Sequence, residues 1–277
     1  MKRWSVTLLA LAVCSAVVHA DVTIVQKTTI EGGAASMAPG GLPSPTMTSR
    51  IKGMQGRMDM DMGSPQIPTN VSTITDATAK QIIILDNNAK TARVSSVAAP
   101  SHPEAGAPTA TITMDGSISP TGKSQTINGM KCDEYTFATS MSMADIGGGQ
   151  IPPEAAAAMA GVKMVMTGSV WVAKEAPGAA EYRAYQKALS GSDLVNAAIG
   201  ATGLSMPGMD KMAKAMASVD GVPVLTEMTM TIEGQGEMAD MLRQMGAMKI
   251  TTKVTSVNTD AIAADAFKVP EGYQVIK

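Results

Sequence analysis

Residues 127–173 hold two long stretches in which apolar and polar residues alternate, and this feature constrains the fold most. In the first stretch, one set of alternate positions carries large apolar side chains: Tyr135, Phe137, Met141 and Met143. A period of two is typical of a half-buried strand, because successive side chains point to opposite faces of a sheet. The second stretch, residues 164–173, predicts a neighbouring antiparallel strand. The chain should therefore build a sheet with one largely apolar face.

The same alternation recurs along the chain and predicts about ten strands. The further strand patterns cover residues 22–30, 50–62, 71–75, 81–85, 90–97, 109–118, 123–127, 222–233 and 248–254. Residues 50–62 are expected to form one strand with Gly56 at a bulge. Its apolar face would carry Met54, Met58, Met60 and Met62. Residues 267–273 are expected to close an edge of the sheet.

Between residues 173 and 222 the apolar period changes to that of a helix. Tyr182, Tyr185 and Leu189 form one helical stripe. Two further stripes consist of methionines: Met209, Met212 and Met216, and then Met238, Met241 and Met245. Antiparallel strands with segregated helices indicate the α+β class. One curved antiparallel sheet with short helices over its concave face would bury all of these stripes.

Residues 1–20 have the features of a secretory signal peptide. Lys2 and Arg3 form a basic segment, an apolar run follows, and the small residues around Ala20 predict cleavage between Ala20 and Asp21. We therefore expect a periplasmic protein without a transmembrane segment once the signal is removed. The remainder, 21–277, is expected to be a single domain with flexible Gly/Pro-rich loops at 31–47 and 98–109.

Charge and cysteine content narrow the classes of partner. The net charge of −2 includes two cations of the signal, so the exported chain carries about −4 and has no basic cluster. This balance argues against a nucleic-acid partner. Cys132 is the single cysteine after residue 20, so no intramolecular disulfide is expected. It is interpreted as a buried apolar residue, with an intermolecular disulfide as the alternative.

No catalytic motif is visible. The sequence lacks a nucleophile elbow, a phosphate loop and a metal-spaced histidine cluster. Asp59 and Asp61 are read as the solvated face of a strand. We therefore expect neither an enzyme nor a resident cofactor.

The chain has 24 methionines but only 3% aromatic residues. Three interpretations stay open. The methionines could be plain core filling, since thioethers adapt to irregular apolar space. They could line a cavity for an apolar ligand. They could also bind Cu(I), because thioethers are soft ligands, with Met58, Met60 and Met62 as candidates.

Four short motifs carry a resemblance to a known group of proteins. They are residues 127–135 (INGMKCDEY), 170–173 (VWVA), 221–224 (GVPV) and 267–273 (FKVPEGY). As a set they resemble a family of exported bacterial proteins of unknown function, over most of the chain outside the two loops. That family is similar to the periplasmic lipoprotein carriers, the LolA-like proteins. The resemblance implies a half-barrel whose helices plug a hydrophobic cavity for acyl chains, with methionines here in place of the carriers' aromatic residues.

These observations lead to one leading hypothesis. The chain is expected to bind an apolar or acylated ligand, a lipid or a lipoprotein, in a methionine-lined cavity. The candidate lining residues are Tyr135, Phe137, Met141, Met143, Met209, Met212, Met216, Met228, Met230, Met238, Met241 and Met245. The alternative is a periplasmic Cu(I)-binding protein, and the third is a structural envelope protein without a small ligand. Oligomeric state stays open.

Overall fold

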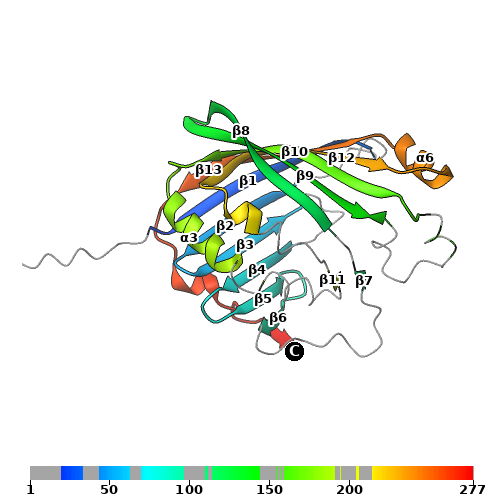
Figure 1. The fold of residues 1–277 in the computed structure, drawn as a ribbon. Helices are drawn as coiled ribbons and strands as arrows, with labels where there is room; N and C mark the ends of the chain where they lie inside the picture. The colour runs from blue at the N-terminus through cyan, green and yellow to red at the C-terminus, as the bar shows by residue number, and fades with distance from the viewer. Residues whose placement is uncertain are drawn as a thin grey trace, which may run out of the picture.

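A computed structural model describes residues 20–33, 44–62, 70–96, 110–111, 114–143, 154, 157, 159–190, 194, 204–205 and 214–276. Its main feature is one curved sheet of 12 strands that does not close on itself (Figure 1). In spatial order the strands are β14 (Gln274–Ile276), β6 (Thr91–Ser96), β5 (Gln81–Asp86), β4 (Asn70–Asp76), β3 (Gln55–Asp61), β2 (Thr46–Lys52), β1 (Val22–Gly32), β13 (Met248–Asn258), β12 (Val222–Glu233), β10 (Lys163–Ala173), β9 (Met130–Ser142) and β8 (Met114–Ile127).

All neighbours in this sheet pair antiparallel except β14 and β6, which are parallel. A separate pair consists of β7 (Ala110–Thr111) and β11 (Leu204–Ser205). Among the described residues, the helical elements with complete bounds are α3 (Ala179–Ser190), α6 (Glu237–Gln244) and the 3-10 turn η2 (Ala264–Phe267). Residues 214–217 are also helical. The expected α+β class with a curved antiparallel sheet is therefore confirmed at this level. No helix in the described part of the chain is long and apolar enough to cross a bilayer.

The sheet joins two meanders through a pairing that is distant in sequence. Strands β1 to β6 follow one another in order, and β8, β9, β10, β12 and β13 do the same. Strand β1 pairs with β13 along its length, from Thr23 opposite Asn258 to Gly32 opposite Met248. This pairing places the first strand in the middle of the sheet, where both of its edges are hydrogen-bonded.

The prediction of one strand over residues 50–62 is wrong. The chain turns at Gly53 and Met54, so β2 and β3 form a hairpin in which Lys52 lies opposite Gln55. Gly53 adopts a φ of 56°, a left-handed conformation that glycine tolerates without steric cost. Met54 therefore lies at the turn instead of on the shared apolar face. Gly56 is an ordinary strand residue in an unbroken register, not a bulge.

The two faces of the sheet have different covers. On one face α3 packs over β1, β2 and β12, and its Tyr185 joins a core cluster with Val22, Ile24 and Ile51. On the opposite face, the C-terminal segment brings Phe267 against β4 to β6. The strand residues of that second cluster are Ile74, Ile83, Leu85 and Ala92. The segment then ends as β14 on the edge of β6. The tail therefore closes an edge of the sheet as expected, but through residues 274–276, whereas Phe267, Val269 and Tyr273 of the expected stretch pack on the second cluster.

Candidate ligand-binding site

Helix α3 packs on the sheet through its two tyrosines, Tyr182 and Tyr185. The apolar period of three and four residues places Tyr182, Tyr185 and Leu189 on one side of the helix, as expected. The Tyr185 ring lies directly on Gly56 of β3, and its hydroxyl hydrogen-bonds the Thr75 hydroxyl of β4. A Cβ at residue 56 would collide with that ring. The glycine is thus required by the approach of the helix.

The burial of Tyr182 and Tyr185 changes the pKa of both phenols. Burial raises the pKa of Tyr182 to about 12, although a hydrogen bond with Gln186 acts in the opposite direction. Burial likewise raises the pKa of Tyr185, against the hydrogen bond with Thr75. Both side chains are therefore neutral at physiological pH, and the underside of α3 is uncharged at these positions.

A cavity of about 290 Å³ lies between α3 and strands β1 to β4. Most of its lining surface is apolar. The apolar side chains around it are Ile24, Met47, Ile51, Met58, Tyr182, Tyr185, Leu189, Val222 and Pro223. Gln26, Ser49 and Thr73 add a few polar groups. This volume is at the lower limit of small-molecule sites, which typically measure about 300–1,000 Å³.

A smaller cavity of about 130 Å³ adjoins the same helix. It shares Tyr182, Gln186 and Pro223 with the first cavity, and Met216 and Val219 also line it. Helix α3 therefore borders two cavities that share part of their lining.

Beyond the helix, the same face of the sheet carries rows of methionines across four strands. Met141 lies opposite Met164, Met166 opposite Met230, and Met230 opposite Met248. Directly opposed residues share a face. We define the methionine ladder as Met141, Met164, Met166, Met228, Met230 and Met248, all of which are half-buried.

The ladder and the cavity lie on one face of the sheet. Met248 is opposite Gly32 on β1, and alternation along β1 then leads through Ile30 and Thr28 to Gln26 and Ile24, which line the cavity. The two features thus lie on one surface, which starts under α3 and extends towards β9. Between them the hydroxyls of Thr28 and Thr252 hydrogen-bond each other at 2.9 Å.

Phe137 covers a glycine in the neighbouring strand of this surface. Gly168 on β10 lies opposite Phe137, and a Cβ at residue 168 would come within 2.9 Å of the ring. Two residues further along β9, the Thr139 side chain is 8% exposed. Its hydroxyl has no hydrogen-bond partner among the described residues. An uncompensated hydroxyl of this kind is uncommon in a folded protein.

The expected lining residues are brought together only in part. Tyr135, Phe137, Met141, Met228 and Met230 lie on the common face. Met143 lies just past β9, and its N–H donates to the Val162 carbonyl over 2.9 Å. None of the expected lining residues lines the larger cavity. Met209 and Met212 lie outside the described residues.

The expected inward face of α6, formed by Met238, Met241, Leu242 and Met245, is wrong for Met241 and Met245. Met241 is 62% exposed and Met245 is 41% exposed, whereas Ala239 is fully buried. Met238 and Leu242 are half-buried and flank Ala239. The helix packs on β12 through a stripe shifted around its axis from the one we expected, because a helix of eight residues offers few apolar positions to fix its rotation.

The residues that line the cavity were missed for two reasons. Tyr182, Tyr185 and Leu189 are visible in the sequence as a helical stripe, but nothing local shows that the stripe packs on β1 to β4. Met47 lies in a stretch that was assigned to a loop. Its position opposite Met60 follows from the β2–β3 hairpin, whereas the sequence pattern predicts one continuous strand over residues 50–62.

The candidate metal ligands are partly confirmed as neighbours. Met58 and Met60 lie on the same side of β3 and are 37% and 36% exposed. Met62 lies past the end of β3.

Cys132 is fully buried, its Sγ is 3.4 Å from the Met130 carbonyl oxygen, and burial raises the pKa of the thiol. The interpretation of Cys132 as a buried apolar residue is confirmed.

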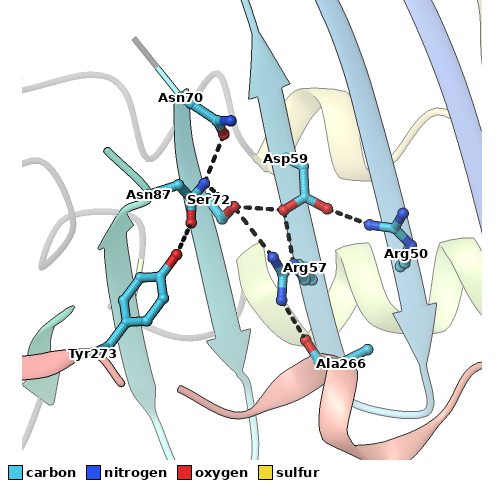
Figure 2. Close-up of polar contacts among 8 residues, drawn as sticks. All are labelled: Arg50, Arg57, Asp59, Asn70, Ser72, Asn87, Ala266 and Tyr273. Atoms are coloured by element: carbon cyan, nitrogen blue, oxygen red, sulfur yellow. Dashed lines mark hydrogen bonds and ion pairs between the residues drawn. The ribbon is translucent and has the colours of Figure 1, made fainter. Parts of the chain in front are cut away.

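A polar cluster occupies the opposite face of β3 and β4, as Figure 2 shows. Asp59 accepts hydrogen bonds from Arg57 Nε at 2.8 Å and Ser72 Oγ at 2.5 Å, and it pairs with Arg50. Arg57 also donates to the Ala266 carbonyl at 3.0 Å. Asp59 is therefore not the solvated strand residue that we expected. Its cluster ties the C-terminal segment to the sheet.

The cluster continues to the end of the chain through β4 and the β5–β6 turn. Asn87 Nδ2 donates to Ser72 Oγ at 2.9 Å and to Asn70 Oδ1 at 2.7 Å, and the Tyr273 hydroxyl donates to Asn87 Oδ1 at 2.7 Å. Burial alone would raise the pKa of Asp59, but the hydrogen bonds from Ser72 and Arg57 lower it below its usual value. These groups are hydrogen-bonded to one another, which supports a structural role.

Comparison with curated proteins found no match. An uncharacterized conserved protein from Thermus thermophilus is similar in structure, with 7% identity, a TM-score of 0.38, and coverage of 94% of this chain and 91% of that one. PNGF-II is similar with 8% identity and a TM-score of 0.35, over 93% of this chain and 31% of that one. This chain thus spans about a third of PNGF-II. Similarities of this size carry no argument about function.

The sequence of one region does match a family model. Of the four motifs behind the expected resemblance, 127–135 lies inside the matched region and the other three lie outside it. The predicted resemblance to a family of unknown function is confirmed for that region. Residues 36–146 match the model described as a domain of unknown function, DUF4412.

Proposed function

We propose that this protein is an exported, non-catalytic binding protein for an apolar or acylated ligand, a lipid or a lipoprotein acyl chain. The ligand enters the cavity between α3 and the sheet. The proposal treats the sheet as a LolA-like half-barrel and places the protein in the periplasm after removal of residues 1–20. The observation that carries it is the 290 Å³ cavity, whose lining is mainly apolar and which lies on the same face of the sheet as the methionine ladder.

The size of the cavity indicates what part of a ligand it takes. At the lower limit of small-molecule sites, it suits one acyl chain end or a small apolar group. The rest of a longer chain would lie along the ladder, where methionine side chains adapt to an irregular apolar partner. The half-buried state of every ladder residue leaves surface for that contact.

The chemistry of the lining supports an uncharged ligand portion. The tyrosine hydroxyls of α3 are neutral, and Gln26, Ser49 and Thr73 are polar without charge. Arg50 and Arg57 also border the cavity, but both guanidinium groups pair with Asp59 in the polar cluster on the opposite face. A carboxylate introduced on the inner side of α3 would have to lose water without gaining a partner, which is costly.

The test is a titration with a fluorescent fatty acid. Leu189→Asp places a carboxylate at the cavity wall and should abolish binding. Leu189→Met keeps an apolar side chain of similar volume and should bind within several-fold of the wild type. Ala184→Asp adds the same charge at an exposed position of α3 and serves as the matched control.

Two results would overturn the proposal. One is absence of saturable binding by the folded wild-type protein. The other is equal binding by the wild type and Leu189→Asp, which would place the probe elsewhere. A structural envelope protein without a small ligand would give the first result.

A further inference from the structure

The β2–β3 hairpin brings three thioethers together on one face. Met47 on β2 lies directly opposite Met60 on β3, and Met58 is two residues from Met60 on the same strand. Ser49 lies opposite Met58 on this face. The hairpin turn at Gly53 creates this grouping, because it folds Met47 back beside residues 58 and 60.

The spacing of these positions lets three sulfurs meet. Directly opposed residues of antiparallel strands have Cβ atoms about 4.5–5.5 Å apart. Alternate residues of one strand are about 6.5 Å apart. Methionine is unbranched and has three rotatable side-chain bonds, so the sulfurs of Met47, Met58 and Met60 can converge on one point above the hairpin.

Core packing does not account for these side chains. Met58 and Met60 are 37% and 36% exposed, and Met47 is half-buried. Unbranched thioethers fill irregular gaps in a core, but here two of them are more than a third exposed on a regular strand. A group of three soft donors, two of which reach solvent, suggests a ligand for the sulfurs themselves.

We propose that Met47, Met58 and Met60 form a Cu(I) site. Thioethers are soft and neutral ligands, which favours Cu(I) over harder divalent ions, and the bound ion keeps its single positive charge without proton release. The site differs from the set of strand neighbours visible in the sequence, since Met47 replaces Met62. It goes beyond the proposed binding of an apolar ligand and does not depend on it, although Met47 and Met58 also border that cavity.

The experiment is a competition for Cu(I) between the full-length protein and a chromophoric Cu(I) chelator under anaerobic, reducing conditions. We expect the wild type to take up one equivalent. Met47→Leu should lower the affinity by about tenfold or more, a loss at least as large as removal of an outer-shell partner usually causes. Met62→Leu should leave it within about twofold, because Met62 lies past the end of β3.

Met54→Leu is the matched control. Met54 is as exposed as Met58, at 37%, and belongs to the same hairpin, but it lies at the turn. The Met54→Leu variant should bind Cu(I) like the wild type. All of these changes conserve side-chain volume at solvent-exposed or half-buried positions, so circular dichroism should show folded proteins throughout.

The outcomes separate the hypotheses. Failure of the wild type to compete for Cu(I) would overturn the site, and so would a Met47→Leu variant with full affinity. Loss of binding in Met62→Leu together with retention in Met47→Leu would restore the ligand set suggested by sequence spacing alone. Zn(II) binding of equal strength would show that the ligands are not thioethers.

Discussion

Thr139→Val tests the one buried hydroxyl that the described residues leave without a partner. The Thr139 side chain is 8% exposed, and its hydroxyl makes no hydrogen bond within the described part of the chain. It lies between Met166 on β10 and Gly116 on β8. A buried donor or acceptor without a partner costs about 1–3 kcal/mol. Valine keeps the branched shape and removes the hydroxyl, so the variant should be more stable by about 1 kcal/mol or more.

Urea unfolding measures this gain. The midpoint should rise while the slope with denaturant stays constant, because the exposed surface on unfolding is unchanged. In a thermal melt, about 1 kcal/mol corresponds to roughly 2–4 °C for a domain of this size. Thr136→Val is the matched control, since Thr136 lies on the same strand but is exposed. Its effect should stay within about 0.5 kcal/mol.

The reasoning would be refuted by a loss of stability in Thr139→Val, which would reveal an unrecognised partner for the hydroxyl. An equal gain in both variants would also refute it, since that would show a general preference of strands for valine.

The remaining predictions concern a glycine, a carboxylate and the N-terminus. Gly56→Ala should destabilise the fold by about 1–3 kcal/mol, because the new methyl group collides with the Tyr185 ring. An unchanged urea midpoint would contradict the close packing of α3 on residue 56. Asp59 has a pKa below its usual 3.8, so its contribution to stability is full above that pH and lost as the pH falls through the lower folded-state value. Asp59→Asn should therefore be less stable than the wild type at pH 7, and the difference in unfolding free energy should shrink as the pH falls below 3.8 in denaturant melts; a constant difference would argue against the pKa shift. The proposed export predicts a mature protein that begins at Asp21 by intact mass; an acylated species that starts at Cys14 would disprove this.

Local pattern determined most of the strands. Alternation over residues 222–233 predicted β12 with the bounds that the structure shows. Successive side chains of a strand point to opposite faces of the sheet, so the alternation of apolar and polar residues follows the strand from end to end. The stripe of Tyr182, Tyr185 and Leu189 predicted α3 for the same kind of reason. The antiparallel α+β class followed from the short connections between these patterns.

The hairpin at residues 46–61 shows where pattern reasoning failed. A strand that reverses at Gly53 places Ile51 on the face of Met58 and Met60, whereas a strand that continued through it would place Arg50 and Lys52 there. The sequence analysis followed the even positions only from Met54 onward, so this change of phase was missed, and the turn itself depends on a left-handed glycine that has no periodic signature.

The sequence by itself determined the classes of side chain on each strand, the likeness to a family of unknown function and the apolar face of the sheet. Tertiary structure alone decided which of these residues meet. The cavity under α3 and the cluster of Met47, Met58 and Met60 both depend on cross-strand register, and the central pairing of β1 with β13 joins residues more than 200 positions apart in the chain. Local periodicity records which side of a strand is buried, but it contains no information about the partner that buries it.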